Sequence, residues 1–298
     1  MNLRNLLLPT LLFSLLTVKA QDSLFYQNVE WSPDGSRLCT QGTRKSASNF
    51  SPNSYIINIT EGKIERKIEG ATFPVWSPDG RFIAYTRQNN TPHGADIWLL
   101  NVASGLSQMI HGDTSRTAGL TFSPDGKKIC FSSARDPKRN LYLVNTDGTG
   151  IERITFDAVA YFNPVWSPKG DKVLYYRERG DSRDKVCAMD IRTKTEVKLT
   201  DDTLHNYYPC WFPSGKAICY TSSDPHGRTP DSRQIVFFDL DKMQGHYIAG
   251  LEGAFFAKVS SDGQKIAFVK GPWPHSDIFI SAIDGKNAKC ITCRLSPQ

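Results

Sequence analysis

The histidines are the first candidates for chemistry, because an imidazole can bind a metal ion or act as a general base near neutral pH. Five of the six fall in segments without a strand pattern, and these are His93, His111, His205, His226 and His275. The sixth, His246, begins a short strand on the outside of its repeat and is excluded. Each histidine stands alone in its segment, so solvated surface histidines are the alternative to a metal or general-base cluster.

Paired aromatic residues form a second set of candidates. Tyr161-Phe162, Tyr207-Tyr208 and Phe255-Phe256 occupy equivalent places just before a strand in three successive repeats. Tyrosine and arginine are over-represented among the residues that dominate binding interfaces. One aromatic of each pair is expected to pack inside the protein and the other to contact a partner. With nearby residues, including arginines, the predicted partner-binding residues are Tyr161, Phe162, Arg177, Tyr207, Tyr208, Arg228, Phe255, Phe256 and Trp273, and Arg233 is a further flanking charge.

Other reactive patterns are weak. Cys290 and Cys293 form a C-x-x-C, which could serve redox or metal chemistry, but residues three apart in a strand point to opposite faces. Two acidic pairs in loops, Asp181 to Asp184 and Asp201-Asp202, could take part in glycoside chemistry, although a charged loop tip is usually only solvated. The chain has no G-x-S-x-G elbow, no P-loop and no G-x-G-x-x-G, so no cofactor is expected.

A repeated turn positions all of these candidates. Trp31-Ser32-Pro33-Asp34-Gly35 recurs in five further versions, with the turn glycines at residues 35, 80, 126, 170, 215 and 263. Proline presets φ, aspartate bonds back to the backbone and glycine accepts a positive φ, so each copy predicts a tight turn between two strands. The same slot of the repeat holds Cys39, Cys130 and Cys219, or alanine or leucine in other copies, which predicts small buried side chains.

Each repeat has the pattern of four short antiparallel strands. Such a sheet is apolar on both faces and must pack against neighbouring sheets, with the lead tryptophan or phenylalanine as the wedge. Six copies therefore predict an all-β, six-bladed propeller over residues 21–298. The expected blades are 24–70, 71–113, 114–157, 158–203, 204–251 and 252–298. The sequence shows no strand borrowed between the termini, so the ring is expected to close by packing of the first and last blades.

These repeats resemble those of the TolB-type propellers, the periplasmic component of the Tol–Pal system and its relatives. The resemblance covers essentially all of residues 24–298 and implies the fold more strongly than any activity. It implies a role at the cell envelope with a protein or peptide partner. TolB carries an additional α/β domain ahead of its propeller, for which the segment before residue 24 leaves no room.

Strand order separates two faces of the expected disc. The turns between strands one and two and between strands three and four share one face, whereas the loops between strands two and three and between blades share the other. The second set is longer and richer in polar and aromatic residues, so this loop-rich face is the predicted working surface. His111 and His205 lie in connections between blades and are the two candidate metal ligands.

Residues 1–20 have the charged start and 13-residue apolar stretch of a secretory signal, which predicts a periplasmic or secreted protein. The net charge of +6 is mild and spread out, which disfavours nucleic acid. We expect a monomeric, non-enzymatic propeller that binds an envelope protein or peptide. The alternatives are a metal-dependent lyase or hydrolase acting on acidic oligosaccharides, similar to the oligogalacturonate lyases, and a carbohydrate-binding propeller that stacks sugars on the aromatic rim.

Overall fold

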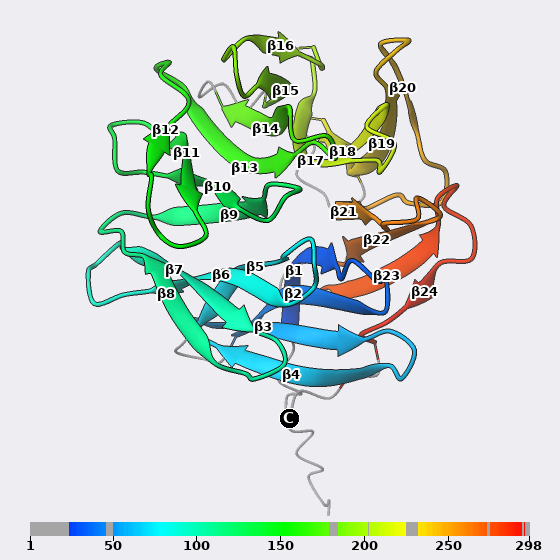
Figure 1. The fold of residues 1–298 in the computed structure, drawn as a ribbon. Coiled ribbons are helices and arrows are strands. Elements are labelled where there is room, and N and C mark those ends of the chain that lie inside the picture. Colours follow the sequence, from blue (N-terminus) through cyan, green and yellow to red (C-terminus); the bar gives the residue numbers. More distant parts are fainter. Residues whose placement is uncertain are drawn as a thin grey trace, which may run out of the picture.

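The described chain is built from strands arranged as a ring of six sheets (Figure 1). The structure is a computed structural model that describes residues 24–45, 50–178, 184–201, 203–224, 232–272, 275–293 and 295. The expected leader at residues 1–20 lies outside them. None of the described residues belongs to a helix long and apolar enough to cross a membrane.

Each sheet contains four antiparallel strands that follow one another in sequence. Blade 1 has β1 (Leu24–Trp31), β2 (Arg37–Lys45), β3 (Phe50–Asn58) and β4 (Lys63–Glu69), and blade 2 has β5 (Ala71–Trp76), β6 (Phe82–Gln88), β7 (Ala95–Asn101) and β8 (Ser107–His111). Blade 3 has β9 (Thr117–Phe122), β10 (Lys128–Ser133), β11 (Asn140–Asn145) and β12 (Glu152–Arg153), and blade 4 has β13 (Ala160–Trp166), β14 (Lys172–Glu178), β15 (Lys185–Asp190) and β16 (Glu196–Lys198). Blade 5 has β17 (His205–Trp211), β18 (Ala217–Ser223), β19 (Gln234–Asp239) and β20 (Gln244–Tyr247), and blade 6 has β21 (Ala254–Val259), β22 (Lys265–Lys270), β23 (Asp277–Ala282) and β24 (Lys289–Cys290).

This arrangement confirms the predicted six-bladed propeller. The repeated tryptophans are the wedges between blades: Trp166 is 8% exposed and packs in one cluster with blade 3 residues such as Leu141 and blade 4 residues such as Tyr175. The predicted small buried slots are confirmed as well, since Cys39, Cys130 and Cys219 have no exposed surface. A core of this kind forms only when neighbouring sheets meet, because each blade buries its faces on the next.

The ring closes between blade 6 and blade 1 without an exchanged strand among the described residues. Trp31 Nε1 donates a hydrogen bond of 2.9 Å to the backbone oxygen of Lys258, and Lys258 Nζ lies 2.5 Å from Glu30 Oε1. Ser276 Oγ donates a further hydrogen bond of 2.9 Å to the backbone oxygen of Tyr26. The junction between blades 6 and 1, here called the seam, is therefore held by polar contacts in addition to the expected packing.

The repeated turns follow the expected chemistry. In blade 2, Ser77 Oγ donates to Asp79 Oδ1 at 2.6 Å, Asp79 accepts from the backbone of Arg81, and Gly80 has φ +70°. Blade 4 has Lys169 in place of the aspartate, and there Asp171 accepts the serine hydroxyl at 2.8 Å. A carboxylate two residues later in the chain thus replaces the missing one.

Acid is expected to weaken the Asp79 turn. The Ser77 hydroxyl, followed by the Arg81 backbone and side chain, lowers the pKa of Asp79 to about 2. A carboxyl whose pKa is depressed on folding stabilises the protein above its ordinary pKa of about 3.9, and this contribution is lost as the pH falls through about 2. Asp79→Asn should therefore be less stable than the wild type at pH 7, and the difference should narrow between pH 4 and pH 2. Urea unfolding across this range measures it, and an equal difference at all pH values would contradict the assignment.

The innermost strands share a bulge at which the backbone enters the left-handed region. Its residues stand at equivalent positions in all six blades, and they are Asn28, Phe73, Gly119, Asn163, Tyr208 and Phe256, with φ between +46° and +61°. Bulges re-aim side chains and are common next to functional sites. Only one of the six is glycine, although a left-handed conformation costs other residues about 1–2 kcal/mol. The fold thus tolerates backbone strain around its axis, where Tyr208 and Phe256 contact each other.

Candidate functional site

A well lies on the loop-rich face beside the axis of the ring. It has a volume of about 440 Å³ and is lined by Phe25, Gln27, Tyr176, Asp184, His205, Tyr207, Tyr208, Arg233, Phe255 and Phe256. The innermost strands β1, β17 and β21 supply seven of these residues. The others come from the end of β14 and from the residues just before β15 and β19. This axial well is within the size range of ligand pockets, which is about 300–1,000 Å³.

A continuous series of aromatic rings crosses the well from blade 4 to blade 6. The ring centroids of Phe162 and Tyr176 are 5.2 Å apart, and those of Tyr176 and Tyr208 are 5.6 Å apart. Tyr208 then stacks on Phe256 with 3.8 Å between centroids, and Tyr207 meets Tyr208 edge to face at 4.8 Å. The series thus connects at least one member of each of the three aromatic pairs.

The two members of each pair have different surroundings. Tyr161 is 2% exposed and packs on Tyr175 in the blade core, whereas Phe162 is half-buried. Phe255 is likewise buried beside a half-buried Phe256. The expected division into one packing and one accessible ring therefore describes blades 4 and 6. In blade 5 both Tyr207 and Tyr208 are half-buried, so that blade offers two rings to the well.

The arginines predicted for partner binding are less accessible to a ligand than the aromatic residues, or lie outside the described residues. Arg177 is 8% exposed, and its Nη1 lies 3.0 Å from Glu196 Oε1 on the outermost strand of its own blade. This ion pair holds blade 4 together and leaves the side chain little surface for a partner. Arg228 and Trp273 lie outside the described residues. Arg233 does line the well, with its guanidinium carbon 4.3 Å from the centroid of the Phe255 ring.

Histidine 205 is the one predicted metal candidate that reaches the well. Its Nε2 shares a hydrogen bond of 2.6 Å with Asp184 Oδ2, and its ring lies 4.6 Å from that of Tyr207. The sequence indicated Asp184 only as part of an acidic pair in a loop, and it gave no indication of Tyr176, Phe25 or Gln27. The position of Asp184 directly before a strand that starts at the loop-rich face was the available signal.

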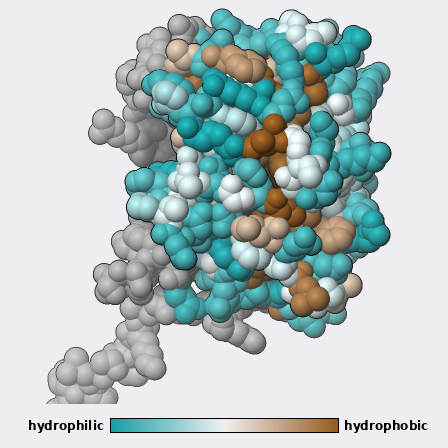
Figure 2. All heavy atoms as spheres, turned by 60° about the vertical axis from the view of Figure 1, so that its left-hand side comes forward, coloured by the Kyte–Doolittle hydropathy of each residue, from teal (hydrophilic) through white to brown (hydrophobic). Residues whose placement is uncertain are grey.

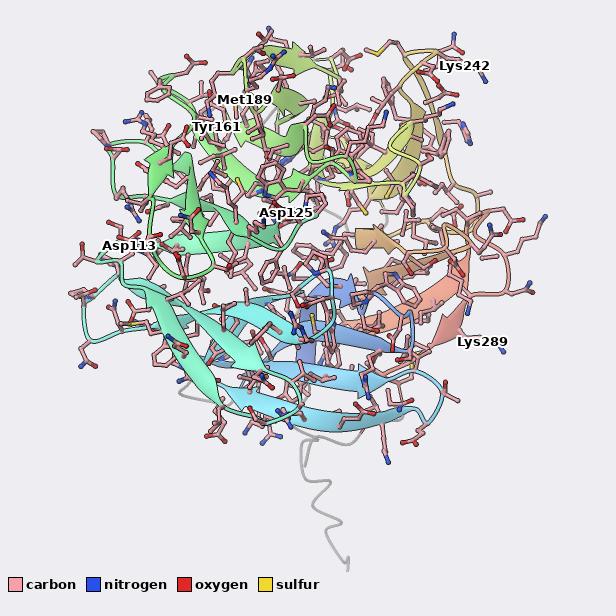
Figure 3. The ribbon with its side chains drawn as sticks, viewed as in Figure 1. Asp113, Asp125, Tyr161, Met189, Lys242 and Lys289 are labelled. Carbon is pink, nitrogen blue, oxygen red and sulfur yellow. A yellow bond between two sulfur atoms is a disulfide. The ribbon has the colours of Figure 1, made fainter. Side chains whose placement is uncertain are left out.

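His111 lies elsewhere, in a polar cluster between blades 2 and 3. Figure 3 shows Asp113, the centre of this cluster, toward the rim of the disc. Arg135 Nη2 donates to His111 Nε2 at 3.0 Å and to Asp113 Oδ2 at 2.7 Å. Desolvation, followed by the charge of Arg135, lowers the pKa of His111, which favours the neutral ring. Because the Nε2 lone pair accepts from an arginine, this histidine joins two blades and is a poor metal ligand.

The described residues contain one group of three side chains close enough to share a metal ion, and it includes no histidine. The group is Asp277, Cys290 and Cys293, but the two sulfur atoms form a disulfide. A disulfide has no thiolate to donate, so this group fits a metal only after reduction. The C-x-x-C pattern that the sequence left open between redox, metal and structural roles is thus a closed bridge at the end of blade 6.

The axial well is closed at its inner end. Below Tyr208 and Phe256 the channel narrows to a space of about 20 Å³, lined in part by Asn28, Glu30 and Lys258. The ion pair between Glu30 and Lys258 lies in this throat. A space of this size is too small for a peptide, so a chain that enters from the loop-rich face is expected to stop in the well.

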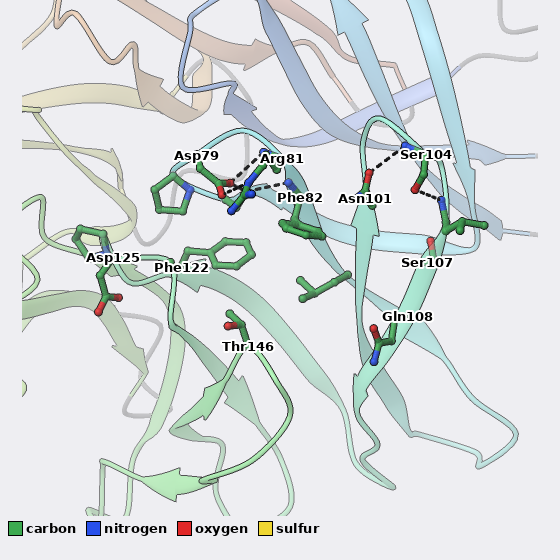
Figure 4. A pocket seen from close by; sticks show the side chains of 16 residues that line it. Asp79, Arg81, Phe82, Asn101, Ser104, Ser107, Gln108, Phe122, Asp125 and Thr146 are labelled. Atoms are coloured by element: carbon green, nitrogen blue, oxygen red, sulfur yellow. Dashed lines mark hydrogen bonds and ion pairs between the residues drawn. The ribbon is translucent and has the colours of Figure 1, made fainter.

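A larger crevice of about 1,030 Å³ opens on the opposite face between blades 2 and 3 (Figure 4). Two of the repeated turns form its wall, including Asp79 and Asp125, and its apolar lining includes the exposed Leu106. A crevice of about 510 Å³, which also contains Asp125, recurs between blades 3 and 4. On this side of the molecule hydrophobic residues form only a narrow, broken band among hydrophilic ones (Figure 2). Such crevices follow from blades that diverge outward, so the axial well is the better candidate site.

Known proteins with the same repeat agree with this architecture. The TolB β-propeller domain family matches residues 29–231. The chain belongs to this family. Among its relatives, the uncharacterized protein Atu1656 of Agrobacterium fabrum is 32% identical over 165 residues, which cover 50% of this chain and 54% of the relative. The Tol-Pal system protein TolB of Francisella tularensis is 25% identical over 217 residues, which cover 72% of this chain and 49% of the relative.

A solved structure of the putative TolB from Agrobacterium tumefaciens superposes with a TM-score of 0.67 at 23% identity, over 79% of this chain and 86% of that one. At this identity the likeness shows the fold alone. The TolB-family chain spans about half the length of the curated relatives it matches. Family membership therefore establishes the propeller and leaves its ligand to be argued from the axial well.

Proposed function

We propose that this TolB-family propeller is a binding protein that acts outside the cytoplasm and holds a peptide segment of an envelope protein in its axial well. The observation that carries the proposal is the aromatic series from Phe162 to Phe256. Its members Tyr176, Tyr208 and Phe256 are half-buried and line a pocket of about 440 Å³. Aromatic side chains offer large contact areas at low entropic cost, and they dominate binding energies in such pockets.

Two further observations support the compartment and the kind of partner. The bridge between Cys290 and Cys293 is the kind of bond that persists in oxidising compartments, in line with the secretory signal expected at residues 1–20. The relative from Francisella tularensis is a Tol-Pal system protein, which supports an envelope partner for this chain. The well contains one histidine, and the described residues surround it with no set of metal ligands, so we propose binding rather than catalysis.

Phe256→Ala is the sharpest test of the proposed function. Envelope proteins captured by the wild-type chain would be purified, and the affinity of each would be measured against the variants by calorimetry. Removing one ring of the stacked pair should weaken the relevant complex by at least about tenfold, because loss of a buried interface aromatic typically costs about 2 kcal/mol or more.

Arg81→Ala is the matched control, since Arg81 is exposed in a turn on the opposite face and does not line the axial well. It should bind like the wild type. A complex that is weakened by Arg81→Ala and unaffected by Phe256→Ala would place the working surface on the opposite face and refute the proposal.

A further inference from the structure

The two charged side chains of the axial well, Asp184 and Arg233, differ in their polar partners. Asp184 is 6% exposed, and one of its oxygens is hydrogen-bonded to His205 while the other is enclosed by protein without a hydrogen-bond partner. A ligand therefore has little direct access to this carboxylate, although its negative charge still acts on the hydroxyls of Tyr207 and Tyr208. Arg233 is half-buried and lies over Phe255, and within the described part of the chain no carboxylate forms an ion pair with it.

Arg233 faces the same space as the two tyrosines of blade 5. Burial is the main cause that raises the pKa of Tyr207 and of Tyr208. The negative charge of Asp184 adds to this rise, and the positive charge of Arg233 acts on both hydroxyls in the opposite direction. A guanidinium without a carboxylate partner, above an aromatic wall, is the geometry in which arginine binds a planar anion through two parallel hydrogen bonds. Of the two charged side chains, the one that a ligand can contact directly is thus the positive one.

The shape of the well restricts which part of a peptide can meet this charge. The inner end is closed by the narrow throat and by the ion pair between Lys258 and Glu30, so an inserted strand of peptide must stop there. A peptide that enters end first places one of its termini in the well, and the two termini differ in charge. An N-terminal ammonium would be repelled by Arg233, whereas a C-terminal carboxylate matches it.

We propose that the axial well captures the free C-terminus of its partner, with the terminal carboxylate paired to Arg233 and the last side chains against Tyr207, Tyr208 and Phe256. This inference rests on the proposed function, because it assumes that the ligand is a peptide. His205, fixed by Asp184, forms the wall on the blade 4 side and positions the aromatic floor through its contact with Tyr207.

Synthetic peptides test the proposal directly. Short random peptides would be displayed in two formats, one with free C-termini and one with free N-termini, and selected on the full chain. We expect binders from the format with free C-termini. Amidation of the C-terminus of a selected peptide should weaken its binding by at least about tenfold, which is the usual loss for a charge-assisted hydrogen-bonded pair.

Arg233→Gln isolates the role of the guanidinium. This variant should bind the free-acid peptide at least about tenfold more weakly and should bind the amidated peptide within about twofold of the wild type, because the partner of Arg233 is already absent. The affinity of Arg233→Lys for the free-acid peptide should fall between those of the wild type and Arg233→Gln, since lysine keeps the charge but loses the two parallel hydrogen bonds. Arg87→Gln is the matched control, because Arg87 also lies over aromatic rings, Tyr85 and Trp98, but outside the well. Thermal unfolding of each variant checks that the fold is intact.

Other results would overturn the C-terminal assignment. Selected peptides that bind through a free N-terminus, or that still bind after amidation, would overturn the C-terminal assignment. If Phe256→Ala abolishes their binding, the proposed function remains supported. Arg233-dependent binding of digalacturonate together with no peptide from either format would overturn both proposals in favour of an acidic sugar. An equal loss of peptide affinity in Arg233→Gln and Arg87→Gln would show that Arg233 acts through the stability of the fold and does not bind the carboxylate.

Discussion

Replacing Trp166 with alanine is expected to lower the free energy of unfolding by about 3–5 kcal/mol, the range found when a buried tryptophan or phenylalanine is removed from a core. Trp166 is the wedge between blades 3 and 4, and its indole packs with residues of both, including Leu143 and Val173. Its Nε1 has no hydrogen-bond partner, so the loss is one of packing and the cavity left behind. Urea unfolding followed by circular dichroism measures the change.

Leu106→Ala is the comparison for this prediction. Leu106 is 74% exposed on the turn face, and replacements at such positions usually change stability by no more than about 0.5 kcal/mol. A Trp166→Ala protein as stable as Leu106→Ala would mean that the blades are held together by something other than the wedges.

Lys258→Met should destabilise the protein by about 3 kcal/mol, because removing one partner of a largely buried ion pair leaves the other charge without compensation. The side chains of Lys258 and Glu30 are 14% and 21% exposed, and the pair joins the last blade to the first. Although burial acts against the ammonium, Glu30 raises the pKa of Lys258 overall. Chemical unfolding at pH 7 measures the loss, and amide hydrogen exchange should show the earliest opening in β1 and β21.

The double variant Glu30→Leu and Lys258→Met separates charge from shape. It should recover most of the lost stability, since replacing a buried ion pair by apolar residues is often neutral. If the double variant is as unstable as Lys258→Met, the lysine contributes through its packing or through the geometry of the Trp31 hydrogen bond, and the pair itself does not hold the seam.

The position of this ion pair indicates how the ring is completed. Glu30 and Lys258 are equivalent residues, each directly before the last residue of the innermost strand. The other four blades have Val75, Thr121, Val165 and Cys210 at that place, and none of these is charged. Charges thus occur only in the first and last blades, where no covalent connection joins the neighbours. We infer that the pair favours correct pairing of the two ends of the propeller over other blade contacts.

The five cysteines outside the disulfide are buried, which limits the access of oxidants in the solvent to their thiols. They are Cys39, Cys130, Cys187, Cys210 and Cys219. Burial raises the pKa of Cys187 to about 12, with further contribution from Glu196. Because the thiolate is the reactive species, such a thiol resists oxidation while the fold is intact.

The repeat determined the architecture from the sequence alone. Six copies of a turn at intervals of 44 to 48 residues required six similar sheets, and the apolar residues on both faces of each required neighbours on both sides. The prediction that aromatic residues at 161–162, 207–208 and 255–256 gather was also within reach, because equivalent positions in a ring lie at equal distances from its axis. The buried slots of Cys39 and Cys130 followed from the same periodicity.

The tertiary structure decided which of these residues can meet a ligand. Repeat position gives the height and radius of a side chain, but its burial depends on the particular neighbour across the blade interface. For this reason Arg177 pairs with Glu196 inside its blade, His111 binds Arg135 from the next one, and only His205 reaches the axial well. The closed throat also depends on residues 228 positions apart, Glu30 and Lys258, which no local pattern connects. The sequence by itself specified the ring, and contacts between side chains far apart in the sequence specified the candidate site.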